Sequence, residues 1–180
     1  RQNTMPQVKR VEAADAVEGF NLVTMPKKYV AIIEADEFVN KKDAKEAKWQ
    51  VVPDLGIWKA GVALFPYTKS TEGSSIDYAF QVQEAKDGAQ ATIILATNFP
   101  FNDGRGQRMT VMLDGKEVQT MNVNEASRYV VQMSHDQNFE WETTRMNKQR
   151  VSLPALTQGK HQLSICPLDP GIVIERIVVE

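Results

Sequence analysis

The chain has 180 residues, of which 42% are hydrophobic and 24% charged, and its formal net charge is −2. This length suggests one domain that can bury a core without disulfide or metal support. Nucleic acid is not an implied partner because the chain has no basic surplus, and no apolar run approaches the roughly 20 residues that a membrane-spanning helix needs.

The chain begins at Arg1 instead of a methionine, so we expect a processed product or a piece of a longer protein. Cys166 is its one cysteine, which excludes an internal disulfide. A small buried hydrophobe is the simpler interpretation of Cys166, because a catalytic thiol would need His135 or His161 as its base.

Short β-rich segments separated by turn signals follow one another along the chain. Residues 1–6 are polar, and residues 8–17 have only weak strand character. Residues 40–48 carry many charges and few apolar side chains, so we predict a solvated loop or a single helical turn. Residues 98–106 are a loop by their proline, glycines and Asn-Asp pair. The predicted strands are residues 29–38, 49–52, 62–67, 76–82, 91–97, 109–113, 118–121, 129–133, 151–153, 163–165 and 172–179.

The strongest local signal is the alternation in residues 76–82. Apolar side chains recur there with a period of two, which is typical of a half-buried antiparallel strand. They are Ile76, Tyr78, Phe80 and Val82. Asp114 and Gly115 then form a hairpin turn signal between two further strands.

These short strands, with no long amphipathic helix among them, indicate an all-β fold. We predict an antiparallel β-sandwich of jelly-roll, galactose-binding-like type. A boundary is expected near Tyr29. Residues 1–28 would be a linker or an extra strand from an upstream domain, and residues 29–180 would form the sandwich domain.

Several motifs occur in an order that resembles a known family. They are IIEADEF at residues 32–38, WQVVPDLG at 49–56, LFP at 64–66, LDG at 113–115, GKH at 159–161 and DPG at 169–171. Together they resemble the C-terminal domain of glycoside hydrolase family 115, whose members are xylan α-glucuronidases. The WQVVPDLG element and the GKH and DPG ending are the most specific parts. The resemblance implies that such a domain follows a catalytic barrel and a helical domain.

The chain is also similar to the β-sandwich carbohydrate-binding modules of families 6 and 35. In those modules, acidic residues of the first and last strands hold a structural calcium ion. The counterparts here are Glu34, Asp36 and Glu175. Two of them depart from the pattern, since Asp36 replaces a glutamate and Glu175 replaces an aspartate.

Two geometric arguments favour this calcium site. Residues i and i+2 of a strand share a face, so Glu34 and Asp36 would point together. A last strand paired beside the first would bring Glu175 near, and calcium prefers six to eight oxygen ligands. The alternative is that all three are surface charges, with Glu175 paired to a nearby cation.

Two loops are candidates for binding a glycan. Trp58 lies between Gly56 and Gly61 and could stack on a sugar ring, or it could pack under a loop or against another domain. The 98–108 loop could grip a carboxylated sugar, since a guanidinium matches a carboxylate with two hydrogen bonds. Its polar residues are Asn102, Asp103, Arg105 and Arg108. The alternative for this loop is a solvated turn.

Other polar and aromatic residues have simpler interpretations. Trp49 and Trp141 are predicted to pack in the core or at an edge, and His161 is predicted to be structural. A second basic cluster follows Trp141 and would be a solvated face or a docking surface. It consists of Arg145, Asn147 and Arg150.

Catalytic motifs such as Gly-x-Ser-x-Gly or His-Glu-x-x-His do not occur. The resemblance agrees, because it places the catalytic residues in a barrel that this chain lacks. We predict a non-catalytic accessory domain of a xylan-degrading α-glucuronidase-like enzyme, serving assembly, docking and, in a second role, glycan binding. The alternative is a free-standing carbohydrate-binding module for plant-type polysaccharide. An independent enzyme is the third interpretation.

The expected partners follow from this interpretation. They are an upstream catalytic domain of the same chain, a polysaccharide, and a second copy joined through exposed sandwich edges. Structural Ca²⁺ is the one cofactor that is expected. The resemblance implies an extracytoplasmic location, periplasmic or secreted, with no signal peptide in this chain.

Overall fold

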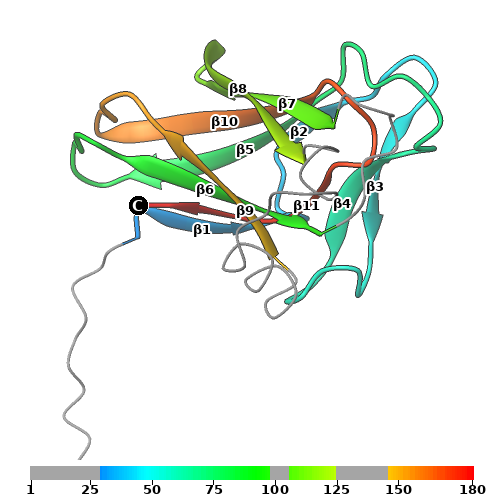
Figure 1. Ribbon diagram of the computed structural model, residues 1–180. Coiled ribbons are helices and arrows are strands. Elements are labelled where there is room, and N and C mark those ends of the chain that lie inside the picture. Colours follow the sequence, from blue (N-terminus) through cyan, green and yellow to red (C-terminus); the bar gives the residue numbers. More distant parts are fainter. Residues whose placement is uncertain (1–28, 98–105, 125–145) are drawn as a thin grey trace, which may run out of the picture.

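The computed structural model describes residues 29–97, 106–124 and 146–180. In these ranges the chain forms two antiparallel sheets that pack face to face. Figure 1 shows them as two layers, with β8, β7, β10 and β5 above β6, β11 and β1. No helix in the described ranges is long and apolar enough to cross a membrane. The all-β sandwich prediction is confirmed.

The first sheet is built around the last strand of the chain. Its order is β3 (Lys48–Val52), β4 (Gly61–Phe65), β11 (Val173–Val179), β6 (Gln90–Ala96) and β9 (Met146–Ser152), and β1 (Ala31–Glu34) also pairs with β11. On one edge of β11, β4 pairs with Val173 and Ile174, and β1 continues that edge from Arg176 to Val179. Paired along both edges by β4, β1 and β6, β11 is a central strand whose backbone hydrogen bonds are made within the sheet.

The second sheet has five strands. Its order is β2 (Asn40–Lys42), β5 (Ser75–Val82), β10 (Gly159–Pro167), β7 (Gln107–Leu113) and β8 (Lys116–Asn124). The hairpin between β7 and β8 turns at Asp114 and Gly115, whose φ angles are 50° and 76°. Positive φ at both turn residues confirms the hairpin that the Asp-Gly pair predicted.

The core lies between the two sheets and takes alternate side chains from each. Fully buried members of the first sheet include Val62, Ile93, Val151, Ile174, Ile177 and Val179, and those of the second include Ile76, Tyr78, Met109, Val111, Leu163 and Ile165. Polar contacts also join the layers. In the middle of the core, the Tyr78 hydroxyl donates to the Ala35 carbonyl at 3.0 Å.

Two predicted segments differ from the structure. Residues 40–48 are not a loop or a helical turn throughout, because Asn40–Lys42 form β2 along the edge of β5. The strand predicted at 151–153 is the end of the longer β9. The strand predicted at 129–133 and the boundary near Tyr29, with residues 1–28, lie in or next to ranges outside the described residues, so both stay predictions.

Candidate functional site

The candidate site lies on the outer face of the first sheet, where β11 carries a β-bulge. The register between β11 and β6 shifts between Ile174 and Arg176, so β11 has one extra residue there. A bulge re-aims a side chain relative to strict alternation. Glu175 and Arg176 accordingly both reach the loop of residues 53–60, which lies over this face.

Arg176 holds an acid on one side and an aromatic ring on the other. Its Cα stands opposite that of Glu34 in β1. Nη2 donates to Oε1 of Glu34 at 2.6 Å, and Nε donates to Oε2 at 3.2 Å. The guanidinium also lies over the Trp58 ring, with Cζ 3.8 Å from the ring centroid. Two-pronged pairing and stacking both suit a planar guanidinium, so Arg176 ties β1 and β11 to the 53–60 loop.

Glu175 binds the same loop through a backbone hydrogen bond. Its side chain is 4% exposed, and Oε2 accepts the backbone N–H of Ile57 at 3.2 Å. Burial raises the pKa of Glu175, although the Ile57 hydrogen bond and the charge of Arg176 act in the opposite direction. Burial disfavours the charged form of a carboxyl, so this acid holds its proton more tightly than an exposed one.

The predicted calcium ligands do not converge in this arrangement. Both oxygens of Glu34 face the Arg176 guanidinium, Glu175 accepts the Ile57 N–H, and Asp36 is exposed. Within the described ranges, no group of three or more His, Cys, Asp or Glu side chains is placed to hold a metal ion. The residues therefore do not fit calcium as they stand, and calcium binding by them stays a prediction.

Trp58 lies in a loop, as predicted, and is 40% exposed. Leu55 and Ile57 of the same loop are exposed to a similar extent. Ile32 of β1 is 53% exposed and precedes Glu34 by two residues, so it shares that strand face. We call these four residues the loop–strand surface. Ile32 was missed from the sequence because its segment was interpreted as one β-rich run.

Arg108 of the 98–108 loop, predicted to bind a carboxylated sugar, instead binds a carboxylate of this chain. Arg108 donates to the Asp169 carboxylate from Nε at 2.7 Å, from Nη2 at 3.1 Å and from its backbone N–H at 2.9 Å. These bonds to Asp169 raise the pKa of Arg108 and tie β7 to the turn before β11. The other members of the predicted group, Asn102, Asp103 and Arg105, lie outside the described residues.

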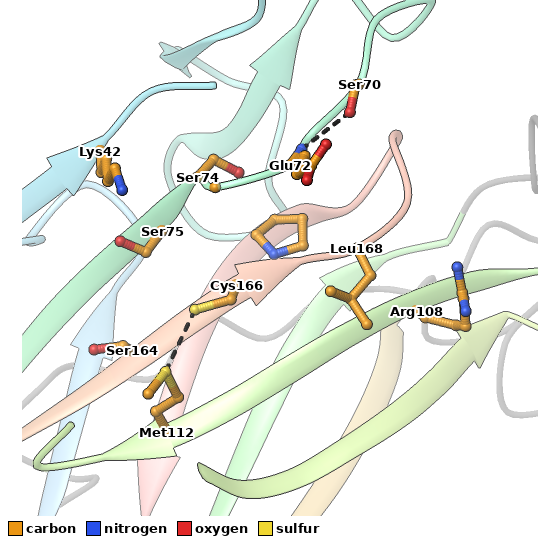
Figure 2. Close-up of a pocket in the computed structure, with 12 residues that line it drawn as sticks. Lys42, Ser70, Glu72, Ser74, Ser75, Arg108, Met112, Ser164, Cys166 and Leu168 are labelled. Carbon is orange, nitrogen blue, oxygen red and sulfur yellow. Dashed lines mark hydrogen bonds between the residues drawn. The ribbon is translucent and has the colours of Figure 1, made fainter. Parts of the chain in front are cut away.

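A pocket on the solvent face of the second sheet was not predicted. It has a volume of about 660 Å³. Figure 2 shows Lys42 and Arg108 at opposite sides of it, with the Cys166 thiol donating to the Met112 sulfur between them. Four serines, at 70, 74, 75 and 164, also line it. Hydroxyl groups together with the charged side chains of Lys42, Glu72 and Arg108 suit a small hydroxylated ligand. The outward side chains of β10, Ser164 and Cys166, were the available sequence signal.

The remaining candidates have structural roles or lie outside the described residues. Trp49 is 2% exposed, which confirms the core prediction, and its Nε1–H donates to the Lys42 carbonyl. The His161 Nδ1 lies 2.8 Å from Oδ2 of Asp114, and hydrogen bonds to Asp114 and Thr157 raise its pKa. Asn147 is buried and donates to the Val123 carbonyl, so it is not on a solvated face. His135, Trp141 and Arg145 lie outside the described residues.

The chain is similar to a known protein family and to several solved structures. A family model described as the glycosyl hydrolase family 115 C-terminal domain matches residues 24–180. None of the curated proteins matches the chain. Similar solved structures include a family GH115 4-O-methyl-α-glucuronidase, BtGH115A, with specificity for decorated arabinogalactans. Its TM-score is 0.60 and its identity 24%, over 87% of this chain and 18% of that chain.

Two carbohydrate-binding modules are also similar. A family 35 module from Clostridium thermocellum has a TM-score of 0.54 and 16% identity, over 83% of this chain and 95% of that chain. The C-terminal family 6 module of LamC, a laminarinase from Zobellia galactanivorans, has a TM-score of 0.51 and 15% identity, over 83% and 97%. At these identities the structures show the fold alone, and they confirm a sandwich of this type.

The family match covers both specific motifs, WQVVPDLG and the GKH and DPG ending. The fold also pairs the first and last strands, as the calcium-site hypothesis expected. The chain spans only 18% of the length of BtGH115A. By its sequence and its fold, this chain belongs to the family of glycosyl hydrolase family 115 C-terminal domains.

Proposed function

We propose that this chain is a non-catalytic accessory domain that docks onto the rest of a family 115 glycoside hydrolase through its loop–strand surface. The family match and the small share of BtGH115A that the chain spans support an upstream catalytic part. We extend the proposal to a parent enzyme that removes α-glucuronic acid from xylan or a related polysaccharide, outside the cytoplasm. Fractionation of the native source would test that location.

The exposed apolar character of the loop–strand surface carries the docking proposal. Ile32, Leu55, Ile57 and Trp58 are 53%, 44%, 45% and 40% exposed. They come from two segments that the Glu34–Arg176–Trp58 contacts hold together. Grouped exposed hydrophobic side chains on a soluble domain indicate an interaction surface. The acids at this surface, Glu34 and Glu175, are engaged with Arg176 and Ile57, which supports docking in preference to catalysis.

Hydroxyl-radical footprinting of this chain alone and of its full-length parent tests the docking. We expect oxidation of Trp58 and Leu55 to fall in the parent. Ile32→Asp should reverse that protection, and Val39→Asp serves as the matched control because Val39 is 59% exposed beside the second sheet. Neither change should alter the melting of the isolated chain by more than the small effect usual for surface sites. Equal oxidation in both proteins would refute docking through this surface.

A second candidate function is glycan binding, for which the pocket of the second sheet is the specific support. Its serines, Lys42 and Arg108 offer donors and acceptors to a hydroxylated ligand. The exposed part of Trp58 is an alternative platform. Affinity electrophoresis in glucuronoxylan and arabinogalactan, with and without calcium, tests both. Lys42→Ala should abolish retardation if the pocket binds, and Trp58→Ala should abolish it if the loop binds. No retardation of the wild-type chain in either gel would refute glycan binding.

A further inference from the structure

On the outer face of the first sheet, Glu34 and Glu175 form a small acidic cluster that already contains a cation, Arg176. Arg176 pairs with both oxygens of Glu34, at 2.6 Å and 3.2 Å, and its other contact is the face of Trp58 at 3.8 Å. The pair is well shielded, since the Arg176 and Glu34 side chains are 20% and 13% exposed. A shielded pair is screened less by salt than a surface pair, so it can organise its surroundings.

We propose that the Arg176 guanidinium is the structural cation of this cluster, joining β1, β11 and the 53–60 loop in the place where the resemblance to carbohydrate-binding modules implied a calcium ion. The inference goes beyond docking, because it identifies Arg176 as the residue that holds Trp58 in position. It also implies that the fold does not need calcium at this site. Its failure would leave the docking proposal standing, since the two are tested by different measurements.

Coordination chemistry supports the guanidinium over calcium. Calcium needs six to eight oxygens at about 2.3–2.6 Å. Both Glu34 oxygens are taken by Nε and Nη2 of Arg176, so an ion at Glu34 would have to displace them. Glu175 contributes little as a replacement ligand, because its Oε2 already accepts the Ile57 N–H from a buried position. Asp36 is exposed, and within the described ranges it does not form, with Glu34 and Glu175, a group placed to hold a metal ion.

The charge count agrees with one monovalent cation. Arg176 neutralises Glu34, with which it forms two hydrogen bonds. Glu175 is 4% exposed, and its Oε2 accepts the backbone N–H of Ile57, so a hydrogen bond from the 53–60 loop stabilises this carboxyl. The stacked Trp58 ring favours a flat, weakly hydrated cation such as a guanidinium, which can contact the ring with one face while its edge meets the acid.

The first test measures calcium dependence directly on the wild-type chain. We expect the same Tm in excess chelator and in millimolar calcium, because an ion that binds only the folded state would raise Tm with its concentration. Isothermal titration with calcium should give no heat of binding. A calcium-dependent rise in Tm that disappears in Glu34→Gln would overturn the proposal.

The second test removes the guanidinium. Arg176→Gln should lower Tm by about 5 °C and shift the emission of Trp58, while Arg176→Lys, which keeps the charge but loses the two-pronged geometry, should lower Tm less. Arg150→Gln is the matched control, since Arg150 is an exposed arginine on β9 of the same sheet. If Arg176→Gln has the same Tm as Arg150→Gln, the proposal is wrong. If Arg176→Gln does not fold, a Tm of Arg176→Lys below that of Arg150→Gln supports it, and equal Tm values contradict it.

Discussion

Tyr78 joins the two sheets through one buried hydrogen bond, and Tyr78→Phe tests how much that bond stabilises the sandwich. The hydroxyl donates to the Ala35 carbonyl at 3.0 Å, and both residues are fully buried. The phenylalanine keeps the ring and its packing but leaves this carbonyl without that donor. A net hydrogen bond contributes about 0.5–1.5 kcal/mol, and an unpaired buried group costs roughly 1–3 kcal/mol. We therefore expect a loss of about 1.5 kcal/mol in the free energy of unfolding.

Urea denaturation followed by circular dichroism gives the loss directly. Thermal melting should show a fall in Tm of about 3–6 °C for a chain of this size. Tyr29→Phe is the matched control, because Tyr29 is 52% exposed and its change should stay within about 0.5 kcal/mol. If Tyr78→Phe is as stable as Tyr29→Phe, the inter-sheet bond does not stabilise the fold.

The pH dependence of the same pair of proteins gives an independent check. Burial, and then the charge of Asp36, raise the pKa of Tyr78 above its ordinary value of 10.0. The folded state therefore holds the phenol proton more tightly, so the stabilisation is complete below pH 10 and is lost as pH rises further. The advantage of the wild type over Tyr78→Phe should shrink above that pH. A constant or growing advantage would contradict a buried, protonated phenol.

Three further predictions use other contacts of the chain. Asp114→Asn keeps a residue that tolerates positive φ but removes the carboxylate that raises the pKa of His161, so nuclear magnetic resonance titration should give a lower His161 pKa. The raised pKa of His161 stabilises the folded wild type at low pH, and this stabilisation is lost as pH rises from 6.5 through the folded-state pKa. The variant should lack the part of it that Asp114 contributes. Glu175→Gln should gain stability relative to the wild type at neutral pH but not below pH 4.5, because burial raises the pKa of Glu175 and penalises its ionised form. Equal pH profiles in urea denaturation would contradict this. Gly61→Ala should cost about 1 kcal/mol, since a Cβ would lie 3.1 Å from Leu55, and an unchanged urea midpoint would contradict that packing.

Local patterns were sufficient to predict most of the strands. The alternation of residues 76–82 became β5, and the Asp-Gly pair became the hairpin between β7 and β8. Both signals depend on a few neighbouring residues and on elementary geometry, so a single sequence carries them. Trp49 was predicted in the core for a similar reason, because it begins a short β-rich run that ends at Pro53.

Elements that depend on distant partners could not be predicted in the same way. Asn40–Lys42 form β2 although all three side chains are exposed, because the edge of β5 pairs with them. Residues 146–150, of which only Met146 is apolar, likewise pair with β6 and extend β9 towards its start. In the candidate site, the pairing of first and last strands was expected, but the register that sets Arg176 opposite Glu34 was not.

The bulge in β11 determines the chemistry of that site, and strict alternation would give a different one. Ile174 and Ile177 are both fully buried, so two residues instead of one must be accommodated between two core positions. With the bulge, Glu175 and Arg176 both reach the 53–60 loop. Deletion of Glu175 should restore regular pairing with β6 and keep the Arg176–Glu34 ion pair, but it removes the acceptor of the Ile57 N–H. We expect the variant to fold, with faster proteolysis of the 53–60 loop than in the wild type. Unchanged cleavage would show that Glu175 does not hold this loop, and loss of folding would show that the sheet itself requires the bulge.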